Sequence, residues 1–276
     1  MDKSGKHSKT GMILTAAGGV LILLSAFILL RIFGGEQRAE EDYSDARDEY
    51  TQSNEIVSLY PAEDPAADDM PAEEKQEPGD GEPEWYEDIA VDVAALKAQY
   101  PEAIGWLYFE DGLISYPLMY SGDNEKYLHK DYTGEESKAG AIFLDGESTP
   151  DLSDVHNLIY GHNMADESMF GKLHKYTAEE DYLKDHRYFR IYTEDAVYRY
   201  EIFAYGDISA YSRIYYAYGP SPKDLPGLIE ELNRLAPADS ETRAGFSDRI
   251  VTLSTCTAGD DNRLIVSAVM VDEAEL

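Results

Sequence analysis

The sequence is short of two residue classes, cysteine and basic residues. Cys256 is the only cysteine among 276 residues, and neither an HExxH motif nor a Cys/His pairing accompanies it. No zinc site or other metal centre is therefore expected. Lys and Arg number 23 against 55 Asp and Glu, which leaves a formal net charge of −32 at pH 7. Such an acidic chain repels the phosphate backbone, so nucleic acid is excluded as a partner.

An apolar run without any charged side chain lies near the N-terminus, at residues 11–30. A run of about 20 residues is long enough to span a bilayer core of about 30 Å. Lysines precede the run and the chain beyond Arg31 turns acidic, so the positive-inside rule places the N-terminus in the cytoplasm. We expect a cytoplasmic tail at residues 1–10, a single-pass transmembrane signal anchor at residues 11–33, and the remainder outside the cell membrane. A cleaved signal peptide is the alternative, but the run is longer than a typical h-region and no A-x-A-like site follows it.

The next segment is strongly acidic. Residues 36–84 carry 18 Asp and Glu against three basic residues, with prolines at positions 61, 65, 71, 78 and 83. A segment of this composition cannot bury enough apolar surface to offset the entropy cost of ordering it. We expect residues 34–84 to form an acidic stalk or linker, largely disordered, that holds the following domain off the membrane. Residues 39–59 contain fewer helix-breaking residues and can form a helix, whereas residues 61–83 are expected to be disordered.

Residues 85–276 are enough for one domain with a sizeable core. Strands are expected at residues 106–109, 113–119, 141–144, 157–160, 188–192, 196–208, 250–255 and 264–271. Eight strands can close into a β-barrel, which removes the sheet edges. Short helices are expected at residues 91–100, 169–176, 178–183 and 225–235. No internal repeat and no glycine-rich phosphate motif is present, and no cofactor is expected.

The single cysteine lies between two strand-like runs, residues 250–255 and 264–271. The segment between them is short and polar and contains Gly259, so the two runs predict a hairpin. Cys256 then ends one strand and Arg263 begins its neighbour. Because adjacent strands lie about 4.8 Å apart, the guanidinium can reach the thiol and bring a fixed positive charge to a potential nucleophile. The alternative is that Cys256 is a small buried hydrophobic residue at a strand end.

A candidate partner for the thiol is His162, in the turn that follows the predicted strand at residues 157–160. Side chains at strand ends project into a cleft rather than into the core. A cysteine nucleophile and its histidine are typically far apart in sequence and close in the fold. The sequence therefore predicts that Cys256 and His162 share one site.

The motifs TLSTC at residues 252–256 and YGHN at residues 160–163, together with Arg263, resemble those of the sortases. Sortases are cysteine transpeptidases that attach surface proteins to the Gram-positive cell wall. The resemblance covers residues 85–276 and the membrane anchor, and it implies the family's mainly β fold, an eight-stranded barrel with short peripheral helices.

The resemblance also implies the reaction and the role of each residue. Cys256 would be the nucleophile, His162 the general acid, and Arg263 the group that steadies the substrate carbonyl or its oxyanion. The substrates would be surface proteins that bear a C-terminal sorting signal, and a thioacyl enzyme would form. An amine of a peptidoglycan precursor would resolve it, with water as the slower acceptor.

Several features resemble class B sortases in particular: the helix at residues 225–235, an opening helix after the stalk, and the segments 122–128 and 162–170. Matching the class B substrate groove by position implicates Asn124, Leu128, Tyr160, Ile214, Tyr215, Ser254 and Thr255. The turn after Cys256 is short for the class. Class B sortases as a group need no calcium ion, which agrees with the expectation that no metal is bound.

Three alternative functions are also considered. A pilin-polymerising sortase would use a protein lysine as acceptor, and such enzymes often carry a lid before the barrel that the acidic segment does not resemble. A non-enzymatic, membrane-tethered surface binding protein would have an unreactive Cys256. A caspase-like hydrolase also has its histidine before its cysteine, but the QAC-x-G surroundings are missing here.

Overall fold

The computed structural model describes residues 25, 41, 43–53, 84–216, 224–237, 240–256 and 261–276. The predicted membrane span at residues 11–33 lies outside this part of the chain, apart from its residue 25. Among the described residues, no helix is both long enough and apolar enough to cross a membrane. The span and the orientation derived from it therefore stay predictions.

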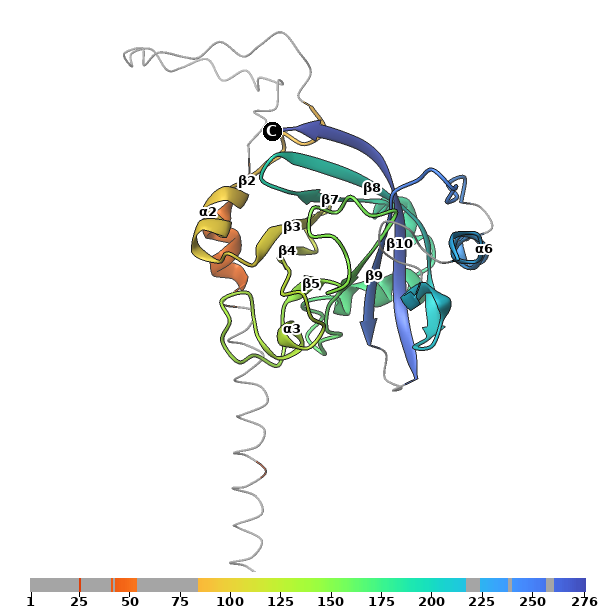
Figure 1. Cartoon of the computed structure of the whole chain (residues 1–276), viewed down its shortest axis with the longest axis horizontal. Coiled ribbons are helices and arrows are strands. Elements are labelled where there is room, and N and C mark those ends of the chain that lie inside the picture. The colour runs from red at the N-terminus through yellow and green to blue at the C-terminus, as the bar shows by residue number, and fades with distance from the viewer. Residues whose placement is uncertain are drawn as a thin grey trace, which may run out of the picture.

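Eight strands form a closed barrel in the order β10-β8-β7-β3-β4-β5-β6-β9, and β9 pairs again with β10 (Figure 1). The strands are β3 (Ala103–Phe109), β4 (Ser115–Met119), β5 (Ile142–Leu144), β6 (His156–Tyr160), β7 (Tyr188–Tyr192), β8 (Ala196–Ser209), β9 (Ile250–Cys256) and β10 (Asn262–Glu275). The eight-stranded barrel expected from the sequence is confirmed. Each strand lies within a few residues of its predicted position, because the apolar and β-branched runs and the turns between them are local signals.

Most neighbouring strands are antiparallel, but β4 pairs with β5 and β6 pairs with β9 in parallel. The barrel is filled by large side chains that are almost inaccessible to solvent, among them Trp106, Phe143 and Phe189. The rings of Phe109 and Phe189 stack with centroids 5.2 Å apart. Burial of such side chains contributes about 1.5–3 kcal/mol each relative to leaving them exposed. The wall that carries the predicted site is therefore attached to a rigid core.

Short helices surround the barrel. They are α2 (Val93–Gln99), α3 (Lys126–His129), η1 (Gly171–His174), α4 (Lys175–Ala178), α5 (Tyr182–Asp185), η2 (Arg213–Tyr216) and α6 (Leu225–Leu235). α6 has the predicted bounds, because Asp224 caps its first turn by accepting a 3.1 Å hydrogen bond from the backbone N–H of Gly227. The predicted helix at residues 178–183 begins later, at Tyr182.

α6 packs on the outside of the barrel, against β8 (Figure 1). Leu228 and Leu232 of α6 are fully buried in an apolar cluster with Phe203 and Ile265 of the barrel wall. Ile214 of η2 is buried in the same cluster. This second core therefore fixes η2 and α6, two helices that lie between β8 and β9 in the sequence.

The first part of the acidic segment packs on the barrel as well. Residues 43–50 are helical, and the helix lies beside α2 (Figure 1). Tyr43, Ala46 and Tyr50 are 1%, 0% and 3% exposed and belong to the main core. The strand β1 (Thr51–Ser53) then pairs antiparallel with β2 (Ile89–Val91).

The sequence placed the start of the folded domain at Trp85 and assigned residues 34–84 to a stalk. In the structure, residues 43–53 are part of the folded domain, so the domain begins earlier in the chain. The physical reason is that three apolar side chains spaced i, i+3 and i+7 form one face of a helix, although the average composition of the segment is acidic. Residues 54–83, which lie outside the described part, connect β1 to the segment that begins at Glu84.

Candidate functional site

The three residues predicted to carry the chemistry lie at the same end of three adjacent strands. In the parallel pair β6–β9, Tyr160 is the register partner of Ser254. His162 and Cys256 each follow two residues later, so the parallel register brings them together at one edge. In the antiparallel pair β9–β10, Cys256 is the register partner of Arg263. Neighbouring strands are about 4.8 Å apart, so the backbone positions of the three residues lie close to one another.

His162 is half-buried, and its ring is held by a backbone carbonyl. Nε2 lies 2.8 Å from the carbonyl oxygen of Leu128. Because a carbonyl can only accept, Nε2 carries the proton in this contact. The carbonyl oxygen of His162 in turn accepts a 3.0 Å hydrogen bond from the N–H of Phe170. Leu128 was predicted to line the substrate groove, and the structure gives it a contact to the histidine that the sequence could not show.

Arg263 is half-buried at the start of β10, between two strands. Its register partners are Cys256 in β9 and Ile208 in β8. Its Nη1 donates a 2.8 Å hydrogen bond to the carbonyl oxygen of Asn262. The hairpin predicted from the two β-branched runs therefore sets Arg263 directly beside the cysteine in register.

Asn124 and Tyr160, both predicted to bind substrate, share one carboxylate. Oδ2 of Asp145 accepts a 2.9 Å hydrogen bond from the Asn124 amide and another of 2.9 Å from the Tyr160 hydroxyl. Oδ1 of Asp145 accepts from the N–H of Glu147, and the Asn124 oxygen accepts from the N–H of Gly146. Asp145 is 2% exposed and was not among the predicted site residues. Its position directly after the predicted strand at residues 141–144 could have indicated it.

The remaining predicted groove residues come from η2 and from the end of β9. The hydroxyls of Tyr215 and Ser254 are 2.8 Å apart and share a hydrogen bond. Ile214 is fully buried, so its side chain packs in the second core rather than on a groove surface. Thr255 is 2% exposed, and its hydroxyl has no hydrogen-bond partner within the described part of the chain.

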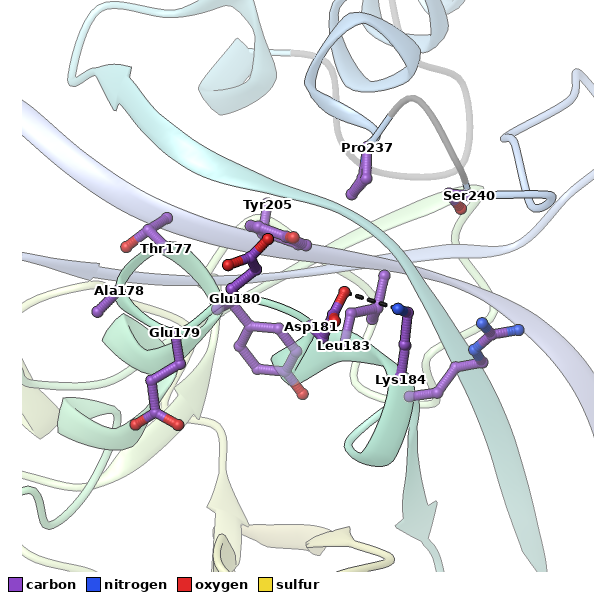
Figure 2. Close-up of a pocket in the computed structure, with 12 residues that line it drawn as sticks. Thr177, Ala178, Glu179, Glu180, Asp181, Leu183, Lys184, Tyr205, Pro237 and Ser240 are labelled. Atoms are coloured by element: carbon purple, nitrogen blue, oxygen red, sulfur yellow. Dashed lines mark ion pairs between the residues drawn. The ribbon is translucent and has the colours of Figure 1, made fainter.

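A cavity of about 640 Å³ lies elsewhere, between α4, α5 and the residues that follow α6. Figure 2 shows its rim, with acidic side chains such as Glu179 and Glu180 and a 2.7 Å ion pair between Asp181 and Lys184. None of the residues predicted for the site lines this cavity. The assignment of the candidate site therefore depends on strand register and residue chemistry, and not on the position of this cavity. No group of three His, Cys, Asp or Glu side chains within the described ranges is arranged to hold a metal ion.

Comparison with known proteins gives concordant matches. A family model described as "Sortase domain" matches residues 120–271. Sortase B of Listeria monocytogenes is 34% identical over 187 residues, which cover 67% of this chain and 76% of that protein. A structure of sortase B from Bacillus anthracis in complex with AAEK1 matches with a TM-score of 0.63 at 24% identity, over 87% of this chain and 99% of that one. A structure of sortase B from Listeria monocytogenes matches with a TM-score of 0.56 at 33% identity, over 64% of this chain and 99% of that one.

Proposed function

Because this chain belongs to the sortase family, as a cysteine transpeptidase of class B, we propose that it cleaves C-terminal sorting signals through a thioacyl intermediate on Cys256. The acyl group then passes to an amine of a peptidoglycan precursor, which anchors the surface protein to the cell wall. The observation that carries the assignment of residues is the register: His162, Cys256 and Arg263 stand at one edge of three neighbouring strands.

The first half of the reaction forms the acyl enzyme. A thiol flanked by a guanidinium and an imidazolium favours its thiolate form, which is the nucleophile. The thiolate of Cys256 attacks a backbone carbonyl of the sorting signal, and negative charge develops on the carbonyl oxygen. Arg263 stabilises that charge, since fixed donors aimed at a developing oxyanion act strongly in a partly desolvated site. The C–N bond breaks, and the leaving amine takes its proton from His162.

The second half releases the product. The amine of the peptidoglycan precursor attacks the thioester carbonyl, the C–S bond breaks, and the thiolate is restored. His162 takes up the proton that the attacking amine loses. Because the Nε2 proton of His162 is bonded to the Leu128 carbonyl, we assign the proton transfer to Nδ1, the other ring nitrogen.

Substrate binding is proposed to involve Asn124, Leu128, Tyr160, Tyr215, Ser254 and Thr255. The hydrogen bonds that Asp145 accepts from Asn124 and Tyr160, and the one shared by the hydroxyls of Tyr215 and Ser254, support this proposal because they order polar side chains around the strand ends. Ile214 contributes by anchoring η2, since its side chain is buried.

We further propose that residues 11–33 span the cell membrane, with residues 1–10 in the cytoplasm and the barrel outside. The support is the uncharged run at residues 11–30 with lysines before it and acidic residues after it. Protease treatment of intact cells tests this orientation, because it should remove the barrel and spare a tag placed before residue 11. Protection of the barrel would overturn it.

The reaction is tested with the protein from residue 36 onward and a panel of fluorescent pentapeptides of sorting-signal type. Mass spectrometry should find an acyl adduct on Cys256 that is absent in Cys256→Ala. His162→Ala and Arg263→Ala should slow adduct formation by roughly 10²-fold or more. His129→Ala is the matched control, because His129 is exposed on α3 and is given no role in the reaction.

Two outcomes would overturn the proposed function. One is the absence of any adduct together with a thiol that resists alkylation in the folded protein, which favours a tethered binding protein. The other is an adduct that forms equally fast in His162→Ala and in His129→Ala, which would remove the histidine from the mechanism.

A further inference from the structure

The imidazole of His162 lies close to Gly140, a position with no room for a side chain. Gly140 adopts a positive φ of 58°. A Cβ atom at this position would stand 3.0 Å from Cδ2 of His162 and 3.2 Å from the carbonyl oxygen of Leu128. Both distances are tighter than ordinary van der Waals contact, so the backbone of Gly140 lies close to the ring and to the carbonyl that holds it. We therefore expect a displacement of Gly140 to affect the position of the imidazole.

A tyrosine from far earlier in the chain is hydrogen-bonded to Gly140. The hydroxyl of Tyr43 donates a 2.7 Å hydrogen bond to the carbonyl oxygen of Gly140. Tyr43 is 1% exposed, and burial raises its pKa well above the usual range. The hydroxyl therefore stays protonated at neutral pH and acts as a donor.

The ring of Tyr43 is also connected, through Tyr116, to the segment that follows His162. It packs edge-to-face on Tyr116, with ring centroids 5.2 Å apart and an interplanar angle of 86°. The hydroxyl of Tyr116 accepts a 3.0 Å hydrogen bond from the N–H of Met169. The next residue, Phe170, donates its N–H to the carbonyl oxygen of His162. Tyr43 thus supports both backbone segments between which the histidine sits.

We propose that Tyr43 is a positioning residue for His162, so that the helix at residues 43–50 sets the geometry of the site from outside the barrel. The inference rests on the proposed role of His162 as the group that gives and takes the proton. Tyr43 touches no reacting atom and acts through Gly140 and through Tyr116. A small rotation of an imidazole away from its productive orientation is costly, because proton transfer requires hydrogen-bond geometry with the reacting group.

The chain offers a matched control on the same helix. Tyr50 is 3% exposed, and its hydroxyl donates a 2.8 Å hydrogen bond to Oε1 of Gln99, away from His162. Tyr43→Phe and Tyr50→Phe each remove one buried hydroxyl and keep the aromatic ring. Both variants should therefore fold and show similar losses of thermal stability, while only Tyr43→Phe should disturb the histidine.

The experiment uses the full chain in detergent, with ¹⁵N-labelled histidine, and the pentapeptide that gives the most adduct. In Tyr43→Phe we expect kcat to fall about 3- to 10-fold with KM changed less than about twofold. The Nε2–H resonance of His162 should move upfield and exchange faster with water, because its hydrogen bond to Leu128 loosens. Tyr50→Phe should match the wild type in both respects.

The outcomes separate this inference from the proposed function. Equal kcat values and equal His162 resonances in Tyr43→Phe and Tyr50→Phe would overturn the positioning role, even if His162→Ala is inactive. Full activity of His162→Ala would overturn the proposed function and this inference with it. A loss of thermal stability in Tyr43→Phe with an unchanged histidine resonance would show a purely structural tyrosine and would also overturn the inference.

Discussion

The hydroxyl of Tyr160 donates a 2.9 Å hydrogen bond to Oδ2 of Asp145, a carboxylate that is 2% exposed. The same oxygen accepts the amide of Asn124, and the second oxygen accepts a backbone N–H. The Asp145 side chain therefore accepts each of these hydrogen bonds. A carboxylate suits this arrangement because both of its oxygens are acceptors.

Asp145→Asn should weaken substrate binding. Asparagine has a single acceptor oxygen, so at least one of the three donors would face an amide NH₂ group. We expect KM for the peptide substrate to rise about 3- to 10-fold, with kcat changed less than about twofold, as one or two charge-assisted hydrogen bonds are lost. Steady-state kinetics measures both constants.

The control for this prediction is another buried aspartate. Asp154 is 0% exposed, and its carboxylate accepts hydrogen bonds from the N–H and the hydroxyl of Thr149, on a turn that carries no predicted site residue. Asp154→Asn should lower thermal stability and leave KM unchanged. If both variants raise KM equally, the effect belongs to the fold as a whole and not to the Asn124 and Tyr160 contacts.

Arg263→Lys should lower activity although the charge is kept. Lysine is a flexible point charge, whereas the guanidinium is a rigid planar group that can direct two donors at one carbonyl oxygen. We expect kcat/KM to fall roughly 10²-fold, a loss similar to that of an oxyanion donor. Arg249→Lys is the comparison, because Arg249 forms a 3.4 Å ion pair with Glu273 and carries no proposed role. Equal activities of the two lysine variants would argue against a directed role for Arg263.

A chain that begins at Trp85 should be much less stable than one that begins at residue 36. The shorter chain lacks Tyr43 and Tyr50, which are almost fully buried, and leaves Tyr116 uncovered. Loss of one large buried aromatic side chain costs about 3–5 kcal/mol, which corresponds to a fall of roughly 10 °C in Tm for a domain of this size. Calorimetry on the two chains measures the difference. Equal Tm values would mean that residues 43–53 add nothing to the fold.

The turn before α3 should be sensitive to acid. Hydrogen bonds from the N–H groups of Lys126 and Glu125 lower the pKa of Asp123, whose Oδ1 accepts both at 2.8 Å. A lowered pKa in the folded state means that the stabilisation is present above the unfolded pKa and is lost as the pH falls through the folded pKa. Wild type should therefore be more stable than Asp123→Ala at pH 6, and the gap should begin to narrow below about pH 4, the unfolded pKa, and close as the pH falls through the lower folded pKa. A gap in thermal unfolding that does not narrow at all below about pH 4 would contradict the assignment.

Local patterns made much of the site predictable. The runs on either side of Cys256 are β-branched and the turn between them is polar, so the hairpin and its register with Arg263 follow from a few neighbouring residues. The histidine could be placed at a strand end for the same reason. The parallel pairing of β6 with β9 brings the histidine next to the cysteine hairpin. This pairing depends on the closure of the whole barrel, and no local signal in the sequence specifies it.

The contacts behind the predicted site could not be derived from the sequence. Asp145, Gly140 and Tyr43 act through hydrogen bonds and close packing between segments far apart in the chain. The sequence did contain a signal for the burial of Tyr43, since Tyr43 shares one helical face with Ala46 and Tyr50. This signal was missed because net charge and proline content were averaged over residues 36–84, although the first part of that segment packs on the barrel.

The packing of the helix at residues 43–50 also sets the reach of the enzyme. Between the end of the proposed span at residue 33 and Tyr43 there are only residues 34–42. A chain covers at most about 3.3–3.6 Å per residue, so this connecting segment is no longer than roughly 30 Å. The acidic residues 54–83, with ten Asp and Glu against one Lys, are flanked on both sides by the folded domain. They therefore add no length between the membrane and the domain. If residues 11–33 span the membrane as proposed, this short connection would confine the active site to a thin layer next to the bilayer, where it would meet reactants that are themselves held at the membrane surface.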